Sequence, residues 1–238
     1  MGSRIEKAPV VEQTRAMSAS VISRPPHEQN TLSYLLVSIR GACSATTRPT
    51  EIECNFMHIS VFGGSQPKEG DAAYYAEAME LGRLLAQRGH TILSGGYIGT
   101  MEAVSPGACE AGGHVVGVTC EDIERWRPIG ANRWVMEERR KKSLLQRLQA
   151  LIEESDAAIA LPGGAGTLTE IALMWNLMIV ESLHRRPLIL VGRGWQSTFD
   201  QFFRELDSYM TAPQREIWCF AKDVHTAVNL LESNVSGR

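Results

Sequence analysis

The chain has 238 residues, of which 44% are hydrophobic and 21% are charged, and its net charge is −3. This composition is typical of a globular protein with a sizeable core, and the acidic balance argues against nucleic acid as a partner. The five cysteines are scattered without a Cys-x-x-Cys pair, so neither a disulfide framework nor a zinc site is expected, and a reducing, cytoplasmic location is favoured. No apolar run reaches the length of about 18 residues that spans a bilayer, so no membrane association is expected.

Residues 1–56 show no sustained hydrophobic periodicity and are rich in Ser, Thr and Pro. Three interpretations stay open for this segment: a disordered tail, an organellar targeting presequence, or residues added upstream of a natural start at Met57. The third is favoured because Met57 begins a stretch with the pattern of a first core strand. We therefore predict a tail over 1–56 and one folded domain over 57–238.

From Met57 onward, short apolar runs alternate with helical patterns. Strands are predicted at 58–62, 90–93, 115–119, 157–161, 186–191 and 217–220, with a short extended piece at 133–135. Helices are predicted at 71–88, 100–111, 136–154, 167–183, 195–209 and 223–232. This alternation predicts a Rossmann-like α/β fold, a doubly wound parallel sheet of about six or seven strands with helices on both faces.

Three of the predicted strands are followed by glycine-rich loops, at 63–65, 95–99 and 163–166. The carboxyl ends of parallel strands meet at one edge of a sheet, where such folds bind their ligands. Glycines leave the backbone open to close approach, and the start of the helix predicted at Thr167 offers unpaired N–H groups to an anion. The sequence therefore predicts a phosphate or nucleotide site, with nine candidate residues: Gly64, Ser65, Gly95, Gly96, Gly99, Gly163, Gly164, Gly166 and Thr167.

Other phosphate-binding and metal-binding motifs are missing from the sequence. No glycine loop is followed by Lys-Ser/Thr, which argues against a Walker ATPase, and 95–99 lacks the spacing of a dinucleotide fingerprint. The six histidines are dispersed, and no His-Glu-x-x-His pattern occurs. We therefore expect neither a metal ion nor an organic cofactor.

The stretch Pro162–Glu170 reads Pro-Gly-Gly-Ala-Gly-Thr-Leu-Thr-Glu. It resembles the Pro-Gly-Gly-x-Gly-Thr-x-x-Glu signature of the LOG family, the cytokinin riboside 5′-monophosphate phosphoribohydrolases. The likeness runs from Met57 to Val191 and includes Gly-Gly-Ser after the first strand and Gly-Gly-x-x-Gly-x-Met at 95–101.

The resemblance implies a homodimer that hydrolyses the N-glycosidic bond of a purine riboside 5′-monophosphate, such as an N6-modified adenine nucleotide, to free base and ribose 5-phosphate. Molybdenum-cofactor carrier proteins share a similar signature, so a non-catalytic carrier of a nucleotide or pterin phosphate stays open as the alternative. The label "lysine decarboxylase-like", which many members bear, is rejected, because no lysine follows a strand or glycine loop where a Schiff base would form.

The resemblance also implies a catalytic glutamate and a catalytic arginine. The glutamate corresponds to Glu170. The arginine lies fifteen residues before Pro162 in the family pattern, which is Arg147 here, and a looser match places it at Arg139.

Helical geometry favours Arg147. On the predicted helix 136–154, Arg147 and Arg140 lie at the edge of the apolar stripe, whereas Arg139 points away from it. That stripe consists of Leu144, Leu145, Leu148, Leu151 and Ile152.

Simpler interpretations exist for the same residues. Thr167 and Glu170 have the spacing of a helix capping box, and Arg147 has the placement of a surface arginine that covers the apolar stripe. Tyr97 and Met101 are expected to be packing residues. The helix predicted at 167–183 is apolar nearly all round, which is typical of a core helix or a subunit contact.

Overall fold

The computed structural model describes residues 56–65 and 72–236. The predictions for the 1–56 tail concern residues that lie outside this range, apart from Phe56, and they stay predictions. Within the described residues the strands are β1 (His58–Phe62), β2 (Thr91–Ser94), β3 (Val115–Gly117), β4 (Glu137–Glu138), β5 (Ala157–Ala160), β6 (Leu188–Val191) and β7 (Cys219–Ala221). The helices are α1 (Ala72–Gln87), α2 (Thr100–Glu110), α3 (Glu121–Trp126), α4 (Leu144–Glu153), α5 (Ala165–Ile179), α6 (Arg193–Leu206), α7 (Ala212–Arg215) and α8 (Val224–Ser236).

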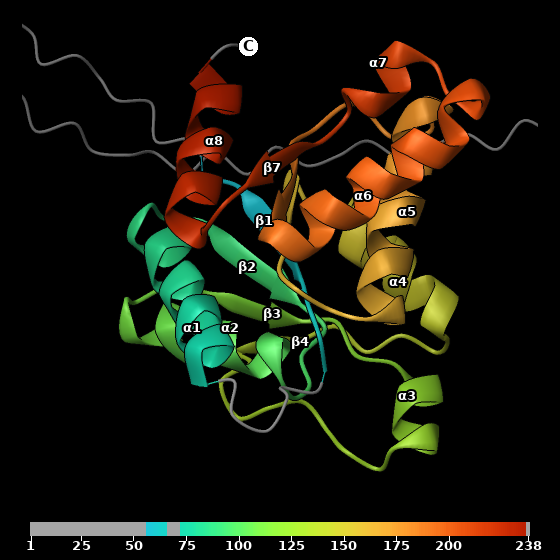
Figure 1. Cartoon of the computed structure of the whole chain (residues 1–238). Helices are drawn as coiled ribbons and strands as arrows, with labels where there is room; N and C mark the ends of the chain where they lie inside the picture. Colours follow the sequence, from blue (N-terminus) through green and yellow to red (C-terminus); the bar gives the residue numbers. More distant parts are fainter. Residues whose placement is uncertain (1–55, 66–71, 237–238) are drawn as a thin grey trace, which may run out of the picture. The chain divides into compact units, whose positions relative to one another are not determined.

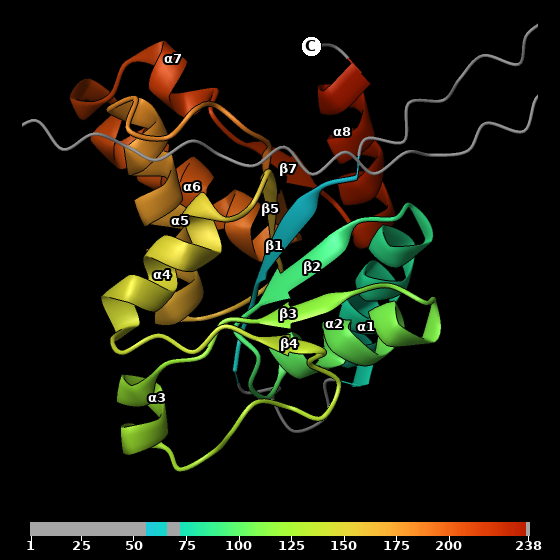
Figure 2. The same cartoon turned by 180° about the vertical axis from the view of Figure 1, so that it is seen from behind.

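The described strands form one parallel sheet in the order β4-β3-β2-β1-β5-β6-β7. Helices α1, α2 and α8 cover one face and α4, α5 and α6 cover the other (Figure 1, Figure 2). Successive strand residues point to opposite faces, so Val61 joins the first apolar core and Phe62 the second. The predicted Rossmann-like, doubly wound fold is confirmed.

The order of the strands places a topological switch point at the centre of the sheet. The chain builds outward from β1 through β2, β3 and β4, and then returns to add β5 on the other side of β1. Ligands of such sheets bind in the crevice beyond the carboxyl ends of the strands at this reversal. The loops after β1 and β5 are two of the three predicted glycine loops.

The predicted helix 136–154 is wrong in its first half. Helix α4 begins at Leu144, where the Ser143 side chain accepts a hydrogen bond from the backbone N–H of Gln146. The preceding residues are extended, because their backbone N–H groups donate to carbonyl groups of β3 and of the residues that follow it. The N–H of Arg139, for example, donates to the carbonyl of Gly117 over 2.9 Å. A run of Glu, Arg and Lys favours a helix locally, but here it forms the exposed edge of the sheet.

Smaller corrections concern the neighbouring segments. The extended piece predicted at 133–135 is a turn, and the strand follows it at β4. Helix α3 lies in a stretch predicted to be a loop, and the short α7 was not predicted. Helix α5 begins at Ala165, two residues before the predicted start at Thr167. Within the described residues, no helix has the length and apolar character needed to cross a membrane.

Candidate active site at the carboxyl edge of the sheet

A pocket of about 390 Å³ lies at the switch point. The loops after β1 and β5, the first turns of α4 and α5, and α3 with its following loop form its wall. The described lining residues are Gly63, Gly64, Ser65, Tyr97, Met101, Ile123, Trp126, Arg127, Ile129, Leu144, Arg147, Leu148, Gly164, Ala165, Gly166, Thr167, Thr169 and Glu170.

The glycines after β5 have two different roles. A Cβ atom on Gly163 would lie 2.1 Å from the hydroxyl oxygen of Thr167, so this glycine allows the loop to fold against the helix. Cβ atoms on Gly164 and Gly166 would meet no described atom within 4 Å, although both residues line the pocket. Packing against the described residues therefore does not explain why these two positions are glycine. A ligand that approaches the backbone closely would explain it, because a side chain there would block the approach.

The start of α5 contradicts the capping-box interpretation. Gly164 is the N-cap residue, and among the described residues no side chain caps this helix end. Thr167 and Glu170 lie inside the helix, and both are buried. The N–H groups of the first turn of α5 therefore face the pocket without a protein cap, which is the arrangement that binds anions.

The loops after β1 and β2 support the loop after β5. The N–H of Gly64 donates to the carbonyl of Pro162 over 3.2 Å, and the carbonyl of Gly64 accepts from Thr100 over 2.9 Å. Gly99 has a φ of +79°, and a Cβ atom there would lie 2.6 Å from the Gly64 carbonyl oxygen. The three glycine loops thus meet at one edge, as the sequence predicts.

The nine predicted phosphate-binding residues differ in their access to the pocket. Gly64, Ser65, Gly164, Gly166 and Thr167 line it. Four others lie outside its described lining: Gly163, Gly95, Gly96 and Gly99. At each of them a Cβ atom would approach a neighbouring residue closely, so these glycines allow tight packing around the loops. Their roles toward a ligand stay predictions.

Arg147 and Glu170 come together inside the pocket. Their side chains are 5% and 9% exposed, and Nη1 of Arg147 lies 3.6 Å from Oε1 of Glu170. Burial raises the pKa of Glu170 to about 7, while the adjacent guanidinium acts in the opposite direction. The carboxyl group can therefore exchange a proton near neutral pH. The burial of Arg147 also contradicts the view that it is a surface arginine.

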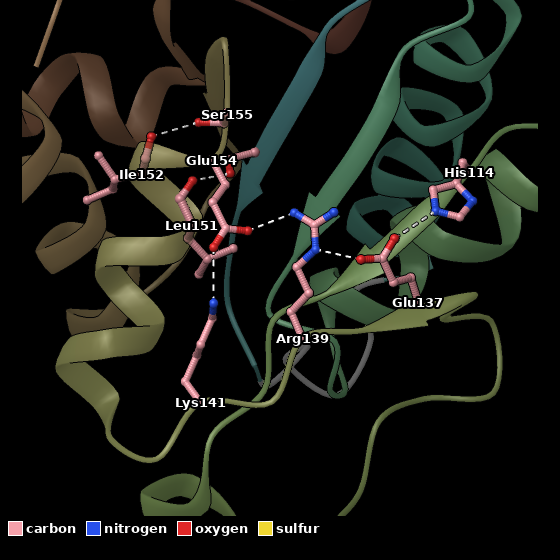
Figure 3. A network of polar contacts seen from close by, with 9 residues as sticks. His114, Glu137, Arg139, Lys141, Leu151, Ile152, Glu154 and Ser155 are labelled. Carbon is pink, nitrogen blue, oxygen red and sulfur yellow. Dashed lines mark hydrogen bonds and ion pairs between the residues drawn. The ribbon is translucent and has the colours of Figure 1, made fainter. Parts of the chain in front are cut away.

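Arg139, the looser match, lies elsewhere. It donates to Glu137 over 2.7 Å and to Glu154 over 2.7 Å, and Lys141 donates to Glu154 over 3.0 Å (Figure 3). This network ties the edge strand β4 to the end of α4, and Arg139 is outside the described lining of the pocket. Arg140 likewise pairs with Glu124 rather than sharing a helix edge with the site arginine.

The apolar wall that α3 and its following loop contribute is not predicted from the sequence. Ile123, Trp126 and Ile129 line the pocket, and the guanidinium of Arg127 lies 5.1 Å from the Trp126 ring centroid. Asp122 anchors α3 by accepting from the N–H of Leu144 over 2.9 Å. The signal that could have revealed α3 is its acidic first turn, which is typical of helix starts.

Metal-binding side chains do not cluster in the described part of the chain. No group of three or more His, Cys, Asp or Glu residues there has the geometry to hold an ion. The residues with polar side chains in its described lining are instead Arg147, Glu170, Arg127, Tyr97, Ser65, Thr167 and Thr169.

Fold and pocket together define a Rossmann-like protein with a pocket at the switch point of its sheet. Residues 56–190 match the model of the SLOG cluster4 family, LDcluster4, which is more than half of the chain. The chain belongs to this SLOG/LOG family, and the predicted resemblance is confirmed.

Two relatives and one solved structure illustrate the range of the family likeness. The chain is 34% identical over 168 residues to the probable cytokinin riboside 5′-monophosphate phosphoribohydrolase LOGL5 of Oryza sativa subsp. japonica, covering 68% of this chain and 66% of the relative. It is 30% identical over 202 residues to the cytokinin riboside 5′-monophosphate phosphoribohydrolase of Rhodococcoides fascians, covering 80% and 94%. The structure of the molybdenum cofactor carrier protein of Chlamydomonas reinhardtii superposes with a TM-score of 0.59 at 25% identity, covering 76% of this chain and 99% of that one.

Proposed function

We propose that this protein hydrolyses the N-glycosidic bond of purine riboside 5′-monophosphates of the cytokinin type, whose adenine carries an N6 substituent, to the free base and ribose 5-phosphate. The observation that carries the proposal is the buried pair of Arg147 and Glu170 beside an uncapped helix start in one pocket. The curated relatives named above are phosphoribohydrolases of this kind, at about 30% identity.

The 5′-phosphate would bind at the start of α5. The open backbone at Gly164 and Gly166 allows a phosphate oxygen to approach the N–H groups of the first turn, and the helix dipole favours its negative charge. Ser65 and Thr167 would add hydroxyl donors from the pocket wall. Anchoring the phosphate in this way holds the ribose in a fixed position for the reaction.

Glu170 would act at the sugar carbon. Cleavage of a riboside develops positive charge on C1′ and the ring oxygen, and a fixed, buried carboxylate stabilises that charge. With a pKa of about 7, Glu170 is also suited to take a proton from the attacking water. Water adds its hydroxyl to C1′ and gives a proton to Glu170, and the leaving base takes up one proton at a ring nitrogen, so the protons balance. This scheme needs one carboxylate and neither a metal ion nor an organic cofactor.

The base would lie toward α3. The wall there is largely apolar, because Ile123, Trp126 and Ile129 line the pocket together with Leu144 of α4. An aromatic ring of this kind stacks on a purine, and the aliphatic side chains suit an apolar N6 substituent. This feature supports a modified adenine as the leaving base.

The test is base release by the purified protein. Incubation with AMP and with isopentenyl-AMP, followed by chromatography, should yield free adenine or isopentenyladenine. Glu170→Gln and Arg147→Ala should each lower the rate by at least about 100-fold. Glu110→Gln is the matched control, because Glu110 is an exposed residue at the end of α2 and lies outside the described pocket lining. If both site variants retain the wild-type rate, the catalytic assignment is wrong.

A second candidate function is the non-catalytic carriage of a phosphorylated pterin or nucleotide. The structural likeness to the Chlamydomonas reinhardtii carrier protein favours it. Tight binding of isopentenyl-AMP by the wild type without any release of base would select this function and reject the hydrolase.

We also propose that the protein is a cytoplasmic homodimer, as the family resemblance implies. Large apolar side chains are exposed on α5 and beyond its end, with Leu168 41% and Val180 57% exposed, and this supports a subunit contact. Sedimentation equilibrium should give twice the chain mass of 26.3 kDa. A monomer at micromolar concentration would reject the dimer.

A further inference from the structure

Glu170 is not the main anchor of the site arginine. The 3.6 Å between the guanidinium and the carboxylate is longer than a charge-assisted hydrogen bond of about 2.7–2.9 Å. The closest polar contact of Arg147 is instead from Nε to the carbonyl of Val118, over 2.8 Å. The guanidinium is therefore positioned from the side of β3, and the Glu170 oxygens stay available to a substrate.

Tyr97 forms a second support for this guanidinium. Its ring centroid lies 5.9 Å from Cζ of Arg147, within the range of a cation–π contact. The Tyr97 hydroxyl accepts from the backbone N–H of Cys120 over 2.7 Å and donates to the carbonyl of the same residue over 3.1 Å. The ring is 2% exposed, so a doubly anchored, buried aromatic face lies against the site arginine.

The second glycine loop also leaves room for the guanidinium of Arg147. A Cβ atom on Gly95 would lie 2.0 Å from Nη2 of Arg147, so only glycine leaves room for the guanidinium there. The Met101 sulfur is 3.7 Å from the same nitrogen. The loop 95–101 thus surrounds the arginine, which accounts for a glycine that is outside the described pocket lining.

We infer that Tyr97 is a positioning residue for Arg147, fixing the guanidinium next to Glu170 through its ring and its two hydrogen bonds to Cys120. This role deepens the proposed hydrolysis and rests on it for the kinetic part of the test. Among the described residues, Glu124 also lies near Tyr97: its carboxylate is 3.5 Å from the hydroxyl and is itself paired with Arg140. Tyr97 contacts the arginine and acts through it.

The kinetic test is a double-mutant cycle with Tyr97→Leu and Arg147→Ala. Tyr97→Leu should lower kcat on the order of 10- to 100-fold, because a misplaced catalytic group costs that much. In the Arg147→Ala background the same substitution should change kcat by less than about 2-fold, because the group it positions is gone. Tyr97→Phe keeps the ring and should recover most of the lost rate. Equal losses in both backgrounds would overturn the inference, since a purely structural residue acts independently of the arginine.

A titration that needs no activity separates this inference from the proposed function. The carboxyl ¹³C signal of Glu170, identified by its loss in Glu170→Gln, reports the pKa of that group. Tyr97→Leu and Arg147→Ala should each raise this pKa, because the guanidinium lowers it in the wild type, and the double variant should show no further rise. An unchanged pKa in Tyr97→Leu, with a raised pKa in Arg147→Ala, would overturn the inference, even if the wild type releases base. If Tyr97→Leu raises the pKa of Glu170 and the wild type releases no base, the inference is supported and the hydrolase is rejected.

Discussion

Gly166→Ala should stabilise the protein while damaging its ligand site. Gly166 is the second residue of α5, and a Cβ atom there would meet no described atom within 4 Å. Alanine is the better helix former and restricts the unfolded chain, so the unfolding free energy should rise by about 0.4–1 kcal/mol. For a protein of this size the thermal midpoint should rise by roughly 1–4 °C.

The added methyl group would occupy the space next to the N–H groups of the first turn. A phosphate held there would lose one or more charge-assisted hydrogen bonds, each worth about 1.5–3 kcal/mol. The affinity for AMP, measured by calorimetry, should therefore fall by about 10- to 100-fold. A gain in stability combined with a loss of binding separates ligand approach from packing as the reason for the glycine.

Gly194→Ala is the matched control. Gly194 is the second residue of α6, a Cβ atom there would also meet no described atom within 4 Å, and the residue is outside the described pocket lining. It should gain similar stability and leave AMP affinity unchanged. If Gly166→Ala binds AMP as tightly as Gly194→Ala does, phosphate binding at the start of α5 is refuted.

Other substitutions test separate parts of the site. The pKa of Glu170 rises from 4.5 to about 7 on folding, so between these pH values the folded state keeps a proton that the unfolded chain loses. As the pH rises from 4.5 to about 7, the unfolding free energy of the wild type should therefore fall relative to that of Glu170→Gln. Urea titrations should find a change of up to about 3 kcal/mol, and a flat difference would contradict the raised pKa. Gly163→Ala should lower the unfolding free energy by about 1–3 kcal/mol, since its Cβ would lie 2.1 Å from the Thr167 hydroxyl oxygen; a neutral effect in thermal unfolding would show that the loop adapts. Arg139→Ala should cost less than about 1 kcal/mol in its half-exposed network and leave base release intact; loss of base release would move the catalytic role to that arginine. Trp126→Ala should raise KM for isopentenyl-AMP by about 10-fold, and an unchanged KM would remove α3 from the base-binding wall.

The predictable parts of this fold are those whose local sequence agrees with their place in the sheet. Strands β5 and β6 are continuous apolar runs because helices cover them on both faces, and in β1 every residue after His58 is buried. Strand β4, by contrast, consists of Glu137 and Glu138 at an exposed edge, where a charged run with helical propensity gives no strand signal. Its conformation depends on pairing with β3, a contact between distant residues.

The site residues, like the strands, are predictable where a local sequence pattern indicates them. Glu170 and the glycines around it belong to one short motif, so the sequence predicts them together. Arg147 is predictable because the apolar stripe that orients it lies within the part of the predicted helix that does form, α4. The roles of Tyr97 and the α3 wall depend on contacts across more than twenty residues, as in the bond between Tyr97 and Cys120, 23 positions apart. The acidic first turn of α3 indicates a helix there but not its place in the pocket wall.

The chemistry of the buried Arg147–Glu170 pair helps to decide between hydrolysis and non-catalytic carriage of the ligand. A carboxyl group buried with only a 3.6 Å contact to its arginine is costly, because desolvation outweighs the attraction and raises its pKa. A carrier breaks no bond and needs no proton acceptor, and an ionised carboxylate beside the phosphate would weaken binding of the ligand. A hydrolase needs that carboxylate, at the one point where positive charge develops and water must lose a proton. Glu170→Gln therefore discriminates the two functions. If the protein is a hydrolase, the variant loses turnover; if it is a carrier, the variant binds the phosphorylated ligand as tightly as the wild type or more tightly.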